Sequence, residues 1–107
     1  MKVTVQHINQ NELTGAVEGF TDVAEVNAWE FEDVNEALEY AYRYTNNVDG
    51  SWSMKIGSDA NADVTVLAPL HVCADGRQMG LRSTSMFDRM IANGKTYKVS
   101  MVGFTEM

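Results

Sequence analysis

The sequence predicts an α+β fold, in which one amphipathic helix over residues 33–46 packs on a mostly antiparallel sheet of four to six short strands. Three observations support this prediction. Apolar and polar residues alternate with a period of two at the start of the chain, a period near 3.6 follows, and Asn93-Gly94 marks a hairpin near the C-terminus. With 107 residues, the chain has the length of a single domain, residues 1–107.

The first segment is expected to be a strand over residues 2–8, because Val3, Val5 and His7 alternate with polar side chains. Residues 9–19 are mostly polar and contain two glycines, which indicates a loop or a loosely paired hairpin. Residues 20–31 have a mixed periodicity, and the aromatic residues at their end favour a strand over residues 26–31.

The helix has the clearest pattern. Asp33, followed three residues later by Glu36, forms a capping-box pattern that places the start of the helix. We expect Leu38 to be buried, with Glu39 and Arg43 exposed and paired at positions i and i+4. The apolar face of the helix is formed by Val34, Ala37, Leu38, Ala41 and Tyr42.

The second half of the chain contains shorter strand patterns. Residues 52–56 are consistent with a short strand, and residues 64–72 with an edge strand or a strand that is broken at Pro69, which lacks a backbone N–H. The dipeptide Asn93-Gly94 separates two strands of a C-terminal hairpin. A competing interpretation makes residues 85–92 a short helix, capped by Ser85 with Asp88 three residues later.

Two segments resemble small proteins that are encoded by tailed bacteriophages and prophages. One is residues 36–53, EALEYAYRYTNNVDGSWS, and the other comprises Arg82-Ser83-Thr84-Ser85, Asp88, Gly94, Tyr97, Val99, Gly103 and Phe104. A glycine usually precedes the aspartate in that group, whereas this chain has Phe87, which puts the geometry of that turn in question. The resemblance implies a phage-type accessory protein and brings no assigned activity and no catalytic residues.

Charge is distributed unevenly along the chain. The net charge is −7, and residues 3–42 contain no lysine or arginine. The nine carboxylates of that stretch belong to Glu12, Glu18, Asp22, Glu25, Glu30, Glu32, Asp33, Glu36 and Glu39. A pI near 4.6 argues against a nucleic-acid partner, which requires a basic surface. The single cysteine excludes an intrachain disulfide, and the chain has neither a membrane-spanning apolar run nor a signal-peptide pattern. We therefore expect a protein of the bacterial host's cytoplasm, without a membrane partner.

The acidic stretch predicts a surface that binds another protein, one of basic character. Exposed charge of one sign steers association, and tyrosine is enriched at interfaces. The residues expected to form this surface are Glu30, Glu32, Glu36, Glu39, Tyr40 and Tyr44. Two alternatives remain open. Basic residues within 77–98 could neutralise the carboxylates internally, and the tyrosines could join Trp29, Phe31 and Trp52 in or beside the core.

An alternative function is a small-ligand or anion-binding module. Arg82, Ser83, Thr84 and Ser85 place a guanidinium and three hydroxyls before a predicted turn or helix start, where backbone N–H groups can hold an anion.

The sequence predicts no metal, no cofactor and no enzymatic activity. Residues 59–63, DANAD, have the spacing that opens an EF-hand loop, but Val64 and Leu70 stand where that loop needs glycine and glutamate. The two histidines and Cys73 lack the spacing of a zinc site. No third group is placed in the sequence to orient a nucleophile and a base, so no catalytic residue is expected.

Overall fold

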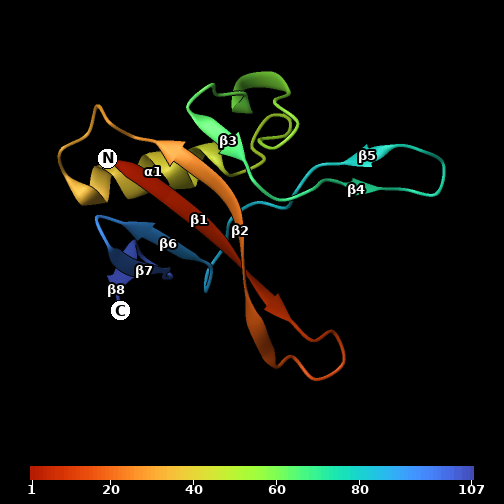
Figure 1. Ribbon diagram of the computed structural model, residues 1–107, viewed down its shortest axis with the longest axis horizontal. Coiled ribbons are helices and arrows are strands. Elements are labelled where there is room, and N and C mark those ends of the chain that lie inside the picture. The colour runs from red at the N-terminus through yellow and green to blue at the C-terminus, as the bar shows by residue number, and fades with distance from the viewer.

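The computed structural model describes all residues 1–107 and has the α+β architecture that the sequence predicts (Figure 1). One α-helix packs on a six-stranded antiparallel sheet of order β3-β2-β1-β6-β7-β8, and β4 and β5 form a separate two-stranded sheet. The elements are β1 (Lys2–Gln10), β2 (Val17–Asn27), α1 (Val34–Tyr44), the 3-10 helix η1 (Gly57–Asp59), β3 (Val64–Val66), β4 (His71–Val72), β5 (Gln78–Met79), β6 (Arg89–Ala92), β7 (Lys95–Val99) and β8 (Phe104–Glu106).

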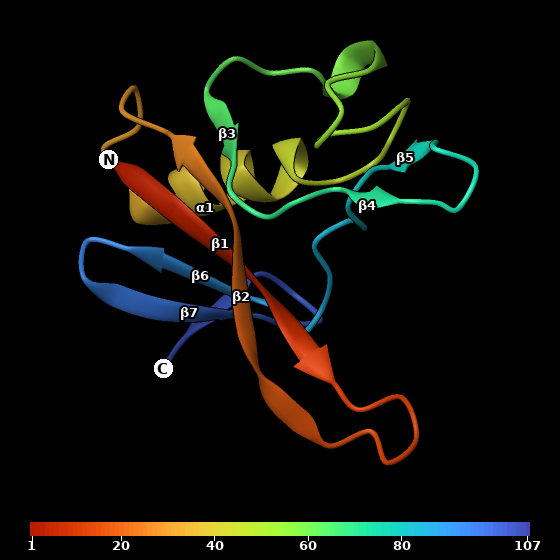
Figure 2. The same ribbon diagram turned by 45° about the vertical axis from the view of Figure 1, so that its right-hand side comes forward.

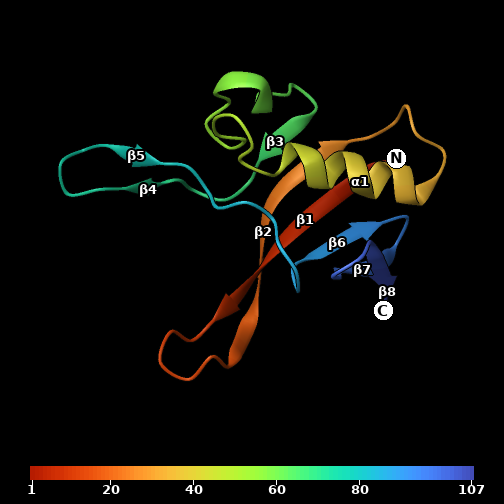
Figure 3. The same ribbon diagram turned by 180° about the vertical axis from the view of Figure 1, so that it is seen from behind.

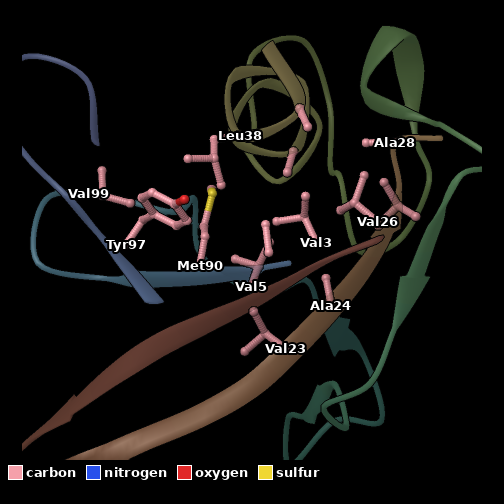
Figure 4. Close-up of a cluster of buried hydrophobic side chains, with 14 of the residues drawn as sticks. Val3, Val5, Val23, Ala24, Val26, Ala28, Leu38, Met90, Tyr97 and Val99 are labelled. Carbon is pink, nitrogen blue, oxygen red and sulfur yellow. The ribbon is translucent and has the colours of Figure 1, made fainter. Parts of the chain in front are cut away.

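The core lies between α1 and one face of the sheet (Figure 4). Alternate residues of a strand point to opposite faces, so Val3 and Val5 of β1 share the face toward α1, and both are fully buried. Leu38 of α1 is also fully buried and points into this layer, as predicted. The residues paired with Val3 and Val5 on the neighbouring strands are Val26 and Ala24 of β2, and Ala92 and Met90 of β6.

The ends of α1 are fixed by side-chain and backbone caps. The carboxylate of Asp33 accepts a hydrogen bond from the N–H of Asn35 at 2.7 Å, which confirms the predicted start of the helix. The helix ends at Tyr44, slightly before the predicted end at residue 46. Thr45 stops it, because its N–H bonds to the carbonyl of Tyr42 and its hydroxyl to the carbonyl of Ala41.

Two hairpins project from the sheet. The outer part of the β1–β2 hairpin, with its connection at residues 11–16, extends beyond the other strands, and the β4–β5 hairpin extends in another direction (Figures 1 and 2). Figure 3 shows α1 across the inner part of β1, away from both projections. As predicted, β3 is an edge strand of the sheet, but it covers only Val64–Val66 of the expected residues 64–72, and His71–Val72 forms β4 in the separate sheet.

Two predicted strands are wrong. Residues 26–31 do not form a strand, because β2 ends at Asn27 and the N–H of Phe31 bonds to the carbonyl of Ala28 in a turn. The strand instead begins earlier, at Val17, within the segment expected to be a loop or a loose hairpin. Residues 52–56 form a turn, which is closed by a bridge between Ser51 and Ile56 and includes Lys55 at φ +58°.

The C-terminal hairpin is confirmed. Strands β6 and β7 are joined by Asn93 and Gly94, at φ +52° and +74°, the conformation that a two-residue turn of this kind requires. The competing helix over residues 85–92 is wrong, because residues 89–92 are strand β6. The expected contact between Ser85 and Asp88 nevertheless forms, in a turn. Phe87 in that turn has φ +79°, the left-handed conformation that glycine adopts without strain.

The expected ion pair on the helix surface is also wrong. Glu39 is exposed as predicted, but Arg43 is only partly exposed, and its Nη1 lies 3.0 Å from Oδ1 of Asp59. Tyr42, expected on the buried face, is 36 % exposed and packs edge-on against Phe104 of β8. The apolar face of α1 is therefore centred on Ala37, Leu38 and Ala41.

Replacing Leu38 by alanine should lower the free energy of unfolding by about 2–5 kcal/mol, because it removes a fully buried side chain from the centre of the core. Urea denaturation followed by circular dichroism measures this change. Glu39→Ala, one residue along on the exposed side, is the control and should change stability by less than about 0.5 kcal/mol. Equal effects of the two substitutions would contradict the packing described here.

Candidate functional site

The carboxylates of the predicted partner surface lie in the connection before α1 and on the helix itself. Glu30 and Glu32 are in the connection between β2 and α1, and Glu36 and Glu39 are on the helix, with all four exposed. None of them forms an ion pair. Of the nine carboxylates in residues 3–42, only Glu25 has a basic partner, Lys2 at 2.8 Å.

The basic residues of the C-terminal part are engaged elsewhere. Arg82 pairs with Asp88, Arg77 with Asp75, and Lys95 with Glu106. The guanidinium of Arg89 lies over the ring of Phe20. No lysine or arginine within residues 77–98 therefore forms an ion pair with the acidic stretch, and Lys2 is the only basic partner of its carboxylates.

The tyrosines of the predicted surface lie at the rim of the core. Phe31, Tyr40 and Tyr44 form a row of rings with centroids 5.1 Å apart, and the guanidinium of Arg43 covers Tyr44. The hydroxyl of Tyr40 donates to Asp63 at 2.6 Å. Burial first, and then this bond, raise the pKa of Tyr40.

The other two aromatic residues considered with them lie apart. Trp52 is buried, and its Nε1 donates to the carbonyl of Arg82 at 2.9 Å. Trp29 is 71 % exposed in the turn that precedes Glu30. The alternative in which the aromatic residues lie in or beside the core is therefore confirmed for Trp52 and wrong for Trp29.

The alternative anion site is occupied from within the protein. The guanidinium of Arg82 donates to both carboxylate oxygens of Asp88, at 2.7 and 2.8 Å. The carboxylate also accepts hydrogen bonds from the N–H groups of Ile8 and Ser85, at 2.8 and 2.7 Å. Burial alone would raise the pKa of Asp88, but Arg82 and these N–H groups outweigh it and hold the pKa below 3.8.

The three hydroxyl residues beside Arg82 make separate structural contacts. Ser83 Oγ accepts a hydrogen bond from the N–H of Asn47 at 2.8 Å, and Ser85 Oγ lies 3.4 Å from the Arg82 guanidinium. Thr84 is buried and contacts His7 Nε2 at 2.9 Å and Thr45 Oγ1 at 2.8 Å. An external anion would therefore compete with Asp88 for Arg82, which disfavours the anion-binding alternative.

These contacts fix the direction of a buried chain of hydrogen bonds. Thr45 donates to the carbonyl of Ala41, so it accepts from Thr84, and Thr84 in turn accepts from Nε2–H of His7. The next proton on the ring must enter at Nδ1. Burial, and then the charge of Arg82, lower the pKa of His7 from 6.5 to about 4, although Asp88 acts in the opposite direction.

Asp59, the first residue of the EF-hand-like pattern, is fully buried and has a structural role. Its Oδ2 accepts hydrogen bonds from three successive N–H groups, of Val48, Asp49 and Gly50, at 2.9, 2.9 and 2.7 Å. The N–H of Gly50 contributes most to lowering the pKa of Asp59. No group of three or more histidine, cysteine, aspartate or glutamate side chains is placed to hold a metal ion.

Comparisons with protein-family models, with curated proteins and with solved structures found no match for this chain. None of the helices has the length and apolar character needed to cross a membrane.

Arg82→Gln should lower the free energy of unfolding by about 3 kcal/mol at pH 7, because it leaves the buried Asp88 carboxylate without its counter-charge. Arg77→Gln is a matched control. It breaks the Arg77–Asp75 pair, whose side chains are 80 % and 54 % exposed, and should cost less than about 1 kcal/mol. Urea denaturation of both variants checks this difference, and equal costs would show that Arg82 acts only at the surface.

The stability of the protein should decrease as the pH falls from about 6.5 to about 4. Above this pH range, His7 is uncharged in both the folded and the unfolded chain. Within it, the unfolded chain binds a proton that the folded ring, with a pKa of about 4, does not. The resulting loss is up to about 3 kcal/mol.

His7→Gln should remove this dependence, because the Gln amide can still donate to Thr84 without taking up a proton. Urea midpoints at several pH values measure the difference between the two proteins. The pKa values of Asp59 and Asp88 are lowered from 3.8, so their stabilisation is lost only at still lower pH. The same dependence between pH 6.5 and 4 in both proteins would exclude His7 as its source.

Proposed function

We propose that this chain is a phage-type accessory protein without enzymatic activity, which binds a basic protein of the bacterial host or of the phage. The binding surface is the acidic surface, formed by Glu30, Glu32, Glu36, Glu39, Tyr40 and Tyr44. The observation that carries the proposal is the absence of any basic partner for the four glutamates. The resemblance of residues 36–53, and of selected positions between Arg82 and Phe104, to phage-encoded proteins supports the proposed source.

A purely structural role accounts for only part of this charge. Carboxylates in the first turn of a helix interact favourably with its dipole, which explains Asp33 and Glu36. That effect is confined to the first turn, so it gives Glu39 and Glu30 no structural purpose. Their mutual repulsion is a cost to the isolated fold, and a basic partner would relieve it.

The half-buried tyrosines suit the same surface. Tyr40 and Tyr44 are held by neighbouring rings and, for Tyr40, by the bond to Asp63, so they lose little conformational freedom on binding. Rigid aromatic rings beside exposed charge combine the contact area and the steering that protein interfaces use.

Replacing Glu32, Glu36 and Glu39 together by glutamine should strongly reduce capture of the partner from a bacterial lysate at low salt. Capture by the unchanged protein should itself weaken on going to about 0.15 M salt, where exposed charges are screened beyond about 8 Å. The partner is retained on immobilised protein, identified by mass spectrometry, and its affinity is then measured with purified components.

The control is a triple variant with the same net charge, Glu12→Gln, Glu18→Gln and Glu106→Gln, whose changes lie at exposed positions outside the acidic surface. It should bind as the unchanged protein does, and circular dichroism should show that both variants are folded. A partner whose affinity ignores both salt and the first triple change would contradict the proposal.

A further inference from the structure

The sheet has a second surface feature, an apolar hollow on the face opposite α1. Because Val3, Val5 and His7 of β1 point toward the helix, Ile8 points to the other face, where it lies opposite Phe20 of β2. The hollow has a volume of about 350 Å³. Its lining residues are Ile8, Gln10, Val17, Phe20, Phe87, Arg89 and Lys98.

Two cations border this hollow without a carboxylate partner. Arg89 and Lys98 are directly opposite each other on β6 and β7, and neither forms an ion pair. The Arg89 guanidinium lies 3.8 Å from the centre of the Phe20 ring, which holds it at the edge of the apolar surface. In a chain of net charge −7, these cations form a local basic site next to exposed aromatic carbon.

Phe87 is an independent sign that the hollow is a binding site. Its φ of +79° is unfavourable for a bulky side chain, and the ring remains 52 % exposed at the edge of the hollow. A glycine would adopt this turn without strain. The fold therefore keeps an aromatic ring exposed at a backbone position that disfavours it, a combination that is typical of ligand-contacting residues.

The chain itself carries a segment with the complementary chemistry. Trp29 is 71 % exposed and is followed by Glu30, which has no basic partner. An apolar ring next to a carboxylate matches an apolar hollow next to two cations. Exposed tryptophan is also among the residues that contribute most to protein interfaces.

The two features cannot meet within one copy. Lys2 of β1 pairs with Asn27, close to Trp29, whereas Ile8 of the hollow lies six residues further along the same strand, roughly 20 Å away. Figures 1 and 2 likewise show the connection between β2 and α1 far from the outer part of the β1–β2 hairpin.

We propose that the hollow binds the Trp29-Glu30 segment of a second copy of this chain, with the indole against Phe20 and Phe87 and the carboxylate between Arg89 and Lys98. A two-fold dimer would contain this contact twice, whereas repetition in one direction would give a chain of copies. The hollow lies on a different face from the acidic surface, its occupant shares only Glu30 with that surface, and the proposal does not depend on the proposed function.

Sedimentation equilibrium of the full chain from about 1 µM to about 1 mM at low salt tests the proposal. The unchanged protein should self-associate. Trp29→Ala and the double variant Arg89→Gln/Lys98→Gln should each weaken self-association by about tenfold or more. Arg77→Gln/Lys95→Gln, with the same change in net charge at other exposed sites, should leave it unchanged.

A mixture of the two weakened variants makes the test specific. Trp29→Ala copies keep an intact hollow and the double-variant copies keep an intact Trp29-Glu30 segment, so the mixture should associate more tightly than either variant alone. A protein that is monomeric over the whole range, an association that neither variant weakens, or a mixture without recovery would each overturn the proposal. Capture of the lysate partner by the double variant should not be weakened, which separates this test from that of the acidic surface.

Discussion

The buried carboxylate of Asp88 connects two parts of the fold that lie 80 residues apart in the sequence. It binds the Arg82 side chain, the N–H of Ser85 in its own turn and the N–H of Ile8 on β1, 80 residues away. Strand β6 begins at the next residue and pairs with β1 in the middle of the sheet. The Asp88 contacts therefore hold the start of β6 beside β1, and β7 and β8 continue the sheet from β6.

Asp59 is a second buried carboxylate whose charge is compensated by hydrogen bonds from an arginine and from backbone N–H groups. Its side chain is as fully buried as that of Asp88, and an arginine together with consecutive N–H groups satisfies it. The arginine that compensates Asp59 lies 16 residues away in the sequence, and the one that compensates Asp88 lies 6 residues away. Both anchor connections that contain little regular structure, residues 45–63 and 80–88, where they act together with the apolar packing of Trp52 and Leu81.

This arrangement explains which parts of the structure could be predicted from the sequence. The cap at Asp33, the face around Leu38 and the Asn93-Gly94 turn depend on residues within a few positions of one another, so local patterns were sufficient. The partners of Arg43 and His7 lie 16 and 77 residues away from them in the sequence. The partner of Arg82 is only 6 residues away, but the segment between them is irregular, so no periodicity predicts the contact. The two segments that were wrongly predicted to be strands, residues 26–31 and 52–56, likewise form backbone hydrogen bonds within turns.

The uneven surface charge is a consequence of the same buried pairs. Arg43 lies on the helix beside the acidic surface and could have compensated Glu39, but Asp59 takes it into an internal contact. Asp88 takes Arg82 in the same way. Two of the eight basic residues thus stabilise the interior, and Arg89 and Lys98 lie on the opposite face of the sheet. The fold needs positive charge inside and so leaves the carboxylates around α1 uncompensated. It thereby separates the exposed carboxylates around α1 from Arg89 and Lys98, which border the hollow on the opposite face of the sheet.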